Sequence, residues 1–138
     1  METAKEYSAG GVICKETNDG TLQVLLIRVR KNGFELPKGH VEKGETEQQA
    51  AFRECLEEVG ITSQIKIREE LGRLSYSFEK GEKTIEKNVA YFKFHCPEEF
   101  RYSKPKNTRE IIWVTEGQVD SLELVNEALR PILEKAFQ

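Results

Sequence analysis

Long apolar runs, paired cysteines and a basic excess are all missing from this sequence of 138 residues. No stretch approaches the ~20 apolar residues that a membrane-spanning helix requires, and METAKEYSAGG lacks the basic start and apolar core of a secretory signal. The three cysteines, Cys14, Cys55 and Cys96, are odd in number and far apart, so neither a disulfide framework nor a zinc site is predicted. We therefore expect a cytoplasmic protein with no membrane partner and with reduced, buried thiols.

The balance of charge is slightly acidic. Twenty-one Lys and Arg residues face 24 Asp and Glu residues, which gives a formal net charge of -3. Proteins that bind nucleic acid broadly usually carry a basic excess, so no stable nucleic-acid partner is expected. An anionic ligand would have to be held by local groups or by a metal ion.

The chain shows no internal repeat and no dividing linker, so residues 1–138 are expected to form one domain. Strands are predicted at residues 7–16, 22–30, 63–79, 82–95 and 110–114. Helices are predicted at 47–59 and 122–137, the second with a bend at Pro131. Strands and helices mix without regular alternation, which predicts a mixed α/β layer fold with helices packed on sheets.

The predicted helix at 47–59 has clear signals at both ends. Thr46 and Gln49 have the spacing of a capping box, and Gly60 supplies a stop. The face expected to pack on the core consists of four residues at helical spacing: Phe52, Cys55, Leu56 and Val59.

Three carboxylates of this helix, Glu54, Glu57 and Glu58, are predicted to lie on the face opposite the core. Like charges three and four residues apart repel one another on a helix. A solvated acidic face is one interpretation, but Ala50 and Ala51 lie beside the carboxylates, where small side chains let another backbone approach. Carboxylate oxygens beside the glycine-rich segment PKGHVEKGE suit Mg²⁺, and Mn²⁺ can take its place. The cluster therefore predicts a divalent metal site.

The stretch from Gly39 to Ile61 resembles the Nudix box, G-x5-E-x7-R-E-U-x-E-E-x-G-U, in which U is aliphatic. Ile61 takes the last aliphatic position, and Cys55 at the other one is a mild departure from the pattern. All seven fixed identities match: Gly39, Glu45, Arg53, Glu54, Glu57, Glu58 and Gly60. The resemblance implies a Nudix fold, a mixed β-sheet sandwiched between α-helices with a loop-helix-loop metal site.

The same resemblance implies hydrolysis of a phosphoanhydride in a small-molecule nucleoside polyphosphate. Glu54, Glu57 and Glu58 would bind Mg²⁺, and the carbonyl of Gly39 would join them. Such an ion neutralises phosphate oxygens and lowers the pKa of a bound water for in-line attack.

Two further roles follow from the resemblance. Arg53 would orient Glu45 by a charge-assisted hydrogen bond rather than touch the substrate. The general base stays open between Glu54 or Glu57 within the box and Glu110 downstream.

Outside the box, the chain is similar to the asymmetrical diadenosine tetraphosphate hydrolases, especially small bacterial ones. The similarity implies cleavage to ATP and AMP, with Lys38, Tyr76 and Lys87 on the polyphosphate and an aromatic ring such as Phe78 on adenine. Strand packing for the aromatic residues and a solvated surface for the lysines are the plain alternatives. The similarity is carried by YSAGGVI, by FELPKGHVEKGE and by Tyr76, Phe78, Lys87, Val89, Tyr91 and Phe92.

Other functions stay open on the same scaffold. RNA 5′ ends, diphosphoinositol phosphates and oxidised nucleoside triphosphates are alternative substrates, and a non-catalytic nucleotide sensor is a further class. The acidic total disfavours RNA, and the basic residues near Lys87 are few for a diphosphoinositol. The intact box glutamates disfavour a sensor. The expected assembly is a monomer or a weak dimer.

Overall fold

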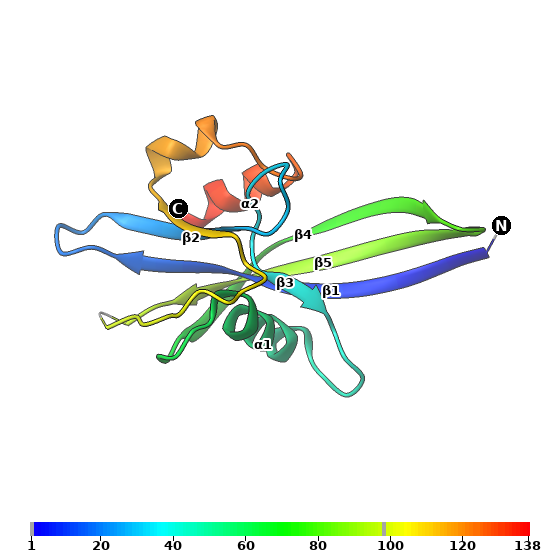
Figure 1. Ribbon diagram of the computed structural model, residues 1–138, viewed down its shortest axis with the longest axis horizontal. Helices are drawn as coiled ribbons and strands as arrows, with labels where there is room; N and C mark the ends of the chain where they lie inside the picture. Colours follow the sequence, from blue (N-terminus) through cyan, green and yellow to red (C-terminus); the bar gives the residue numbers. More distant parts are fainter. Residues whose placement is uncertain (1, 98) are drawn as a thin grey trace.

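The computed structural model describes residues 2–97 and 99–138, and it shows one mixed sheet with a helix on each face (Figure 1). The strands run in the order β4-β5-β1-β2-β6, and the short β3 pairs with β1. The strands are β1 Glu2–Glu16, β2 Leu22–Arg28, β3 Lys38–His40, β4 Lys66–Lys80, β5 Lys83–His95 and β6 Glu110–Val114. The helices are α1 Glu47–Val59, the 3-10 helix η1 Glu116–Ser121 and α2 Leu129–Ala136. The predicted mixed α/β fold is confirmed.

The pairing of β1 with β5 makes the sheet mixed, because these two strands run parallel while the other paired strands are antiparallel. β1 is central, and its segment from Ser8 to Cys14 is buried throughout. A strand covered on both faces has no solvent side, which explains its nearly continuous run of small and apolar residues.

Two hydrophobic cores lie on the two faces of the sheet. Alternate residues of each strand point to opposite faces, so one strand contributes to both cores. The core under α2 includes Val12, Leu26, Leu36, Tyr91 and Leu133. The core under α1 includes Ile13, Leu25, Cys55, Val59 and Phe94. Cys14, Cys55 and Cys96 are free and buried, as predicted.

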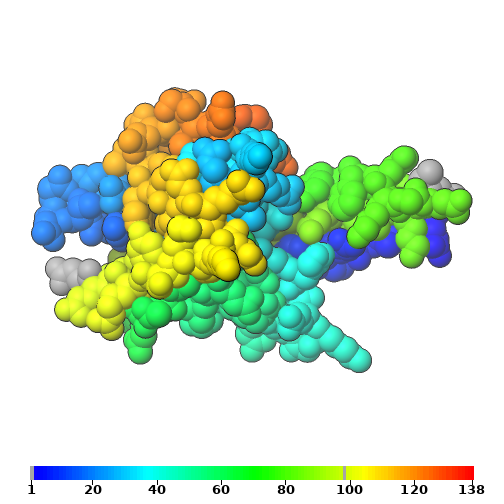
Figure 2. Space-filling view, in the orientation of Figure 1, coloured from blue at the N-terminus to red at the C-terminus, as the bar shows by residue number. Residues whose placement is uncertain are grey.

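The ends of β1, β4 and β5 project from the body as a three-stranded arm (Figures 1 and 2). We define the arm as residues 2–7, 74–80 and 83–88. Tyr7, Tyr76 and Phe78 are large exposed side chains on it. No helix within the described residues is long and apolar enough to span a membrane.

The prediction of a helix over residues 122–137 was wrong for its first half. Residues 122–128 are not α-helical, and α2 begins only at Leu129. Pro131 therefore lies in the first turn, where its missing N–H has no helical partner to lose, and it causes no internal break. The guanidinium of Arg130 donates to the carbonyl of Leu122 at 3.0 Å, which ties the preceding segment to the helix.

Helix α1 has its predicted bounds but is rotated about its axis relative to the prediction. Phe52, expected in the core, is 39% exposed, whereas Ala50 and Ala51 are fully buried. The helix approaches β1 closely because Gly11 has no side chain: a Cβ there would stand 2.3 Å from Sγ of Cys55. The face of the three carboxylates is therefore not opposite the core, and part of it turns toward the sheet.

Candidate functional site

The caps of α1 set where its side chains point. The backbone N–H of Gln49 donates to Oγ1 of Thr46 at 3.1 Å, and the N–H of Thr46 donates to Oε1 of Gln49 at 2.9 Å. Gly60 ends the helix in the left-handed conformation with φ of 75°, and its N–H donates to the carbonyl of Leu56. The predicted capping box and glycine stop are both confirmed.

Two of the three carboxylates meet β3. Oε1 of Glu58 accepts from the backbone N–H of Lys38 at 2.8 Å. The carboxylate of Glu54 lies directly against Gly39, where an added Cβ would be 2.1 Å from the carboxylate carbon. A glycine is therefore required at position 39 for steric reasons.

The meeting of these carboxylates is electrostatically unfavourable. Burial raises the pKa of Glu58 to about 7, against the opposing effect of the Lys38 N–H, and the charges of Glu54 and Glu35 raise it further. A buried carboxyl beside other carboxylates favours its neutral form unless a cation compensates the charge. This part of the molecule therefore favours a bound cation.

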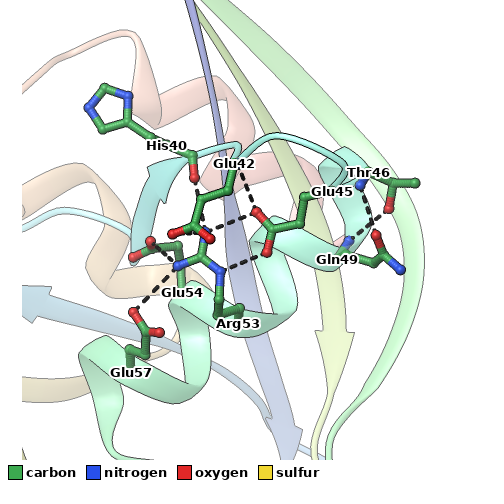
Figure 3. A network of polar contacts seen from close by, with 8 residues as sticks. All are labelled: His40, Glu42, Glu45, Thr46, Gln49, Arg53, Glu54 and Glu57. Carbon is green, nitrogen blue, oxygen red and sulfur yellow. Dashed lines mark hydrogen bonds and ion pairs between the residues drawn. The ribbon is translucent and has the colours of Figure 1, made fainter.

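Arg53 stands at the centre of a polar network, as Figure 3 shows. Its guanidinium binds both oxygens of Glu45, at 2.7 and 3.0 Å. It also donates to Glu54 at 2.7 Å, to Glu57 at 3.5 Å and to the carbonyl of His40 at 3.0 Å. Hydrogen bonds from Arg53 hold the pKa of Glu45 at about 2. The predicted contact between Arg53 and Glu45 is present.

The box residues have the right chemistry for a hard divalent cation. Carboxylates of Glu54, Glu57 and Glu58 with a carbonyl at Gly39 would supply only oxygen ligands, which Mg²⁺ and Mn²⁺ prefer. Arg53 engages two of these carboxylates, and within residues 2–97 and 99–138 no three acidic, His or Cys side chains converge in metal-binding geometry. Side-chain rotation at Glu57, which is 60% exposed, could complete the set.

A cleft of about 420 Å³ opens on the α2 face of the sheet. Lys38 and Tyr76 line it, and Lys87 lies directly across from Tyr76 in the β4–β5 pairing. Burial lowers the pKa of Lys87, and the positive charges of Lys38 and Arg30 lower it further. The cleft is lined by Arg30, Glu35, Lys38, Leu74, Tyr76, Val89, Tyr91, Val125, Asn126, Glu127 and Leu129.

Sequence reasoning missed four polar residues of this cleft, Arg30, Glu35, Asn126 and Glu127. Glu35 is 6% exposed, its Oε2 has no hydrogen-bond partner within residues 2–97 and 99–138, and Nε of Arg30 is 3.9 Å from this oxygen. Asn126 uses its Oδ1 to accept from the N–H of Ala128, and the described chain offers its amide nitrogen no acceptor. The sequence feature that could have identified Glu35 as a site residue is its charge inside the otherwise apolar segment FELP.

Two sequence candidates lie apart from these groups. Phe78 is 40% exposed and does not line the cleft, although its ring centre is 6.3 Å from that of Tyr76. Glu110 lies on β6 and pairs with Arg28 at 3.2 Å rather than with the box network.

The NUDIX domain profile matches residues 5–136. The chain belongs to the Nudix family. Among solved Nudix-like structures, an Ap4A hydrolase from C. elegans superposes with a TM-score of 0.68 at 26% identity, over 96% of each chain. The likeness covers the sheet, both helices and the box.

Curated relatives carry other names. A proposed mutator protein, MutT4, of Mycobacterium tuberculosis is 37% identical over 98 residues, which are 67% of this chain and 39% of that protein. An 8-oxo-(d)GTP phosphatase of Mycolicibacterium smegmatis is 36% identical over 87 residues, 56% of this chain and 26% of that protein. The chain thus spans well under half the length of these two relatives. Nudix hydrolases generally use divalent metals such as Mg²⁺.

Proposed function

We propose that this Nudix domain hydrolyses diadenosine tetraphosphate asymmetrically to ATP and AMP. The observation that carries the proposal is the gathering of Arg30, Lys38 and Lys87 around Tyr76, in a chain whose net charge is -3. Like charges placed together in a partly buried cleft destabilise the empty protein, and a polyphosphate offsets that repulsion. The aromatic ring among them offers a stacking surface for a base.

In this proposal Glu54, Glu57, Glu58 and the carbonyl of Gly39 hold Mg²⁺ or Mn²⁺. The bound ion would supply charge neutralisation at the phosphate oxygens and a water of lowered pKa. The backbone of β3 at Gly39 and the carboxylates of α1 keep these oxygens together, as the contact of Glu54 with Gly39 indicates.

The remaining steps belong to side chains. Arg53 positions Glu54 through a 2.7 Å contact and is itself held by the two-pronged contact with Glu45. Glu57 is the preferred general base, because it is exposed and, among the described residues, has a single ion-pair contact, the 3.5 Å one with Arg53. Glu110 is left out, since Arg28 already engages it on β6.

Phosphate binding is assigned to lysines on two different strands. Lys38 of β3 lines the cleft and follows directly on the loop that carries Glu35, while Lys87 of β5 pairs with Tyr76 and lines the adjoining hollow. Lys38 also donates its backbone N–H to Glu58, so the polyphosphate cleft and the carboxylate site share one residue. This sharing supports a position of the phosphate chain next to the proposed metal ligands.

Product analysis tests the proposal. The protein is incubated with diadenosine tetraphosphate and Mg²⁺, and the nucleotides are resolved by chromatography at early times. We expect equal amounts of ATP and AMP and no ADP. Two molecules of ADP per substrate would contradict the asymmetric cut, and activity that persists in EDTA would contradict the metal site.

A second candidate, an oxidised guanine nucleoside triphosphate, is favoured by Glu35 and Asn126. A guanine edge presents N–H donors beside a carbonyl acceptor, which match the unpartnered Oε2 of Glu35 and the free amide nitrogen of Asn126. The M. smegmatis relative is named for such a substrate. If kcat/KM for 8-oxo-dGTP exceeds that for diadenosine tetraphosphate, and Glu35→Gln lowers only the former, the second candidate replaces the first.

The remaining assignments stay predictions. They are a cytoplasmic location, the lack of a nucleic-acid partner and a single domain over residues 1–138.

A further inference from the structure

β4 is the terminal strand of the sheet, and its outer edge pairs with no strand within the described residues. Fifteen residues long, it runs from the body along the whole arm (Figures 1 and 2). The outer edge of a strand presents unpaired backbone N–H and C=O groups, which another strand can complete. An edge of this length that is not covered is a candidate for pairing with a second copy of the chain.

The side chains of β4 are self-complementary when two copies pair antiparallel about Tyr76. In that register Arg73 lies opposite Glu79 of the second copy, and Leu74 lies opposite Phe78. Two-fold symmetry makes each of these pairs occur twice. Opposite charges and apolar pairs facing each other across antiparallel strands are the side-chain contacts that stabilise a sheet.

The two kinds of pair fall on different faces of the sheet, as a continuous sheet requires. Leu74, Tyr76 and Phe78 alternate along the α2 face, and Arg73 and Glu79 lie on the α1 face. The side chain of Arg73 is 42% exposed and already binds Glu47 at 2.6 Å and Glu70 at 2.9 Å, so Glu79 of the second copy would be a third carboxylate beside it. Glu79 has no cationic partner within residues 2–97 and 99–138, and is available for such a contact.

Neighbouring registers lack the charged pair. Within residues 72–80, pairing about Leu74 joins only residues 72–76 and sets Arg73 against Ser75. Pairing about Ser75 sets Phe78 against Gly72 and Arg73 against Ser77, so the charged pair is lost and Leu74 with Tyr76 is the apolar pair that is kept.

The other open edge of the arm, on β1, is not self-complementary either. Pairing about Ala4 sets Glu2 against Glu6, and pairing about Lys5 sets that lysine against itself. Self-complementarity is therefore a property of β4 rather than of any charged strand in the arm.

We propose that two copies of this chain associate through antiparallel pairing of residues 72–80 of β4, with Tyr76 on the two-fold axis. The pairing stops before Leu71, whose carbonyl accepts from Nζ of Lys135 at 3.2 Å. Leu74 and Tyr76 line the cleft on the α2 face, so Phe78 of the second copy comes to lie at its rim. Phe78, which lies outside the cleft of its own chain, thereby adds an aromatic wall to that of the neighbour.

Disulfide trapping tests the register. Antiparallel partners lie about 4.5–5.5 Å apart between Cα atoms, within the range that a disulfide spans, so Tyr76→Cys should link to itself across the axis. Phe78→Cys is the matched control, because its own copy lies four residues further along the paired strand. We expect covalent dimer from the first variant and not from the second under mild oxidation. Equal linking of both variants, or none at position 76, overturns the register.

Charge reversal tests the interface without touching the cleft. In Glu79→Arg, two arginines face each other twice, and the dimerisation constant measured by sedimentation should weaken at least about tenfold, or 1.4 kcal/mol. Glu79→Gln removes the attraction without adding repulsion and should fall between. A wild-type chain that stays monomeric up to millimolar concentration, or a Glu79→Arg dimer as tight as wild type, overturns the proposal. Because the readout is mass, the result is independent of which substrate is cleaved.

Discussion

The box site and the arm-side cleft differ in how their polar groups are held. In the box, Arg53 binds Glu45 through two hydrogen bonds, and α1 begins with a complete capping box. In the cleft, Oε2 of Glu35 has no hydrogen-bond partner among the described residues, and beside the cleft Lys87 lies near the cations of Lys38, Arg30 and Lys80 as well as the carboxylate of Glu6. Polar groups that hydrogen-bond to one another hold their positions in the structure, whereas buried polar groups without partners are candidates for binding a ligand. In our proposal the box residues hold the metal ion and the cleft holds the substrate.

The largest expected effect comes from breaking the box. Glu57→Gln or Glu58→Gln should lower kcat at least about 10³-fold, or about 4 kcal/mol, because each removes a proposed metal ligand. The circular dichroism spectrum should stay that of the wild type. Glu134→Gln, on the exposed side of α2, is the control. Wild-type turnover by Glu57→Gln would contradict the assignment of Glu57 to the metal site.

Gly39→Ala tests the same site through a steric change that leaves its charge unaltered. Gly39→Ala places a Cβ about where the Glu54 carboxylate lies, 2.1 Å from its carbon, so Mg²⁺ affinity should fall about 10–100-fold. The φ of Gly39 is not positive, so the effect is steric and not conformational. Gly117→Ala, with nothing within 4 Å of the added Cβ, is the matched control. Unchanged titration of Gly39→Ala would contradict the close approach of β3 and α1.

The pKa of Glu58 gives the metal-free protein a characteristic pH dependence. Its folded pKa of about 7 lies above the ordinary value of 4.5, so the folded state holds the proton more tightly. The contribution to stability is full below about pH 4.5, is lost as pH rises through 7, and amounts to about 2 kcal/mol after allowance for partial exposure. Urea unfolding in EDTA measures it. Glu58→Gln should lack this pH dependence, and wild-type and variant curves of the same shape would contradict it.

The smallest expected effect belongs to the cleft. Lys87→Ala should lower kcat/KM for diadenosine tetraphosphate about tenfold, or 1.4 kcal/mol, through loss of one phosphate contact. The melting temperature should not fall, because the other cations already repel Lys87. Lys83→Ala, near the tip of the arm, is the control. An equal loss in both variants would point to a general charge effect instead of a cleft contact.

The box could be predicted because its residues lie close in sequence and bind one another. Thr46 with Gln49 and Arg53 with Glu45 are separated by only three and eight residues, so local spacing determined the contacts. The orientation of α1 could not be predicted, because it depends on Gly11, a residue of a distant strand. Without that contact, periodicity placed Phe52 in the core and turned the carboxylates away from the sheet.

The cleft was only partly predicted because its walls come from separate segments. Asn126 lies in the stretch before α2 that was predicted to be helical, and this error hid its side chain from consideration. Glu35 was hidden by its position in an apolar run, where sequence alone gives no sign of an unpartnered carboxylate. The alternation of side chains along β4 correctly places Phe78 on the α2 face. Its side chain lies further along the arm, outside the cleft.

Binding of Mn²⁺, followed by electron paramagnetic resonance, tests most directly whether the α1 carboxylates and β3 form one divalent-cation site. Wild-type protein, Glu58→Gln and Glu134→Gln are titrated under identical conditions. We expect saturable binding to wild type and Glu134→Gln, with affinity at least about tenfold weaker in Glu58→Gln. Undiminished Mn²⁺ binding by Glu58→Gln would contradict it.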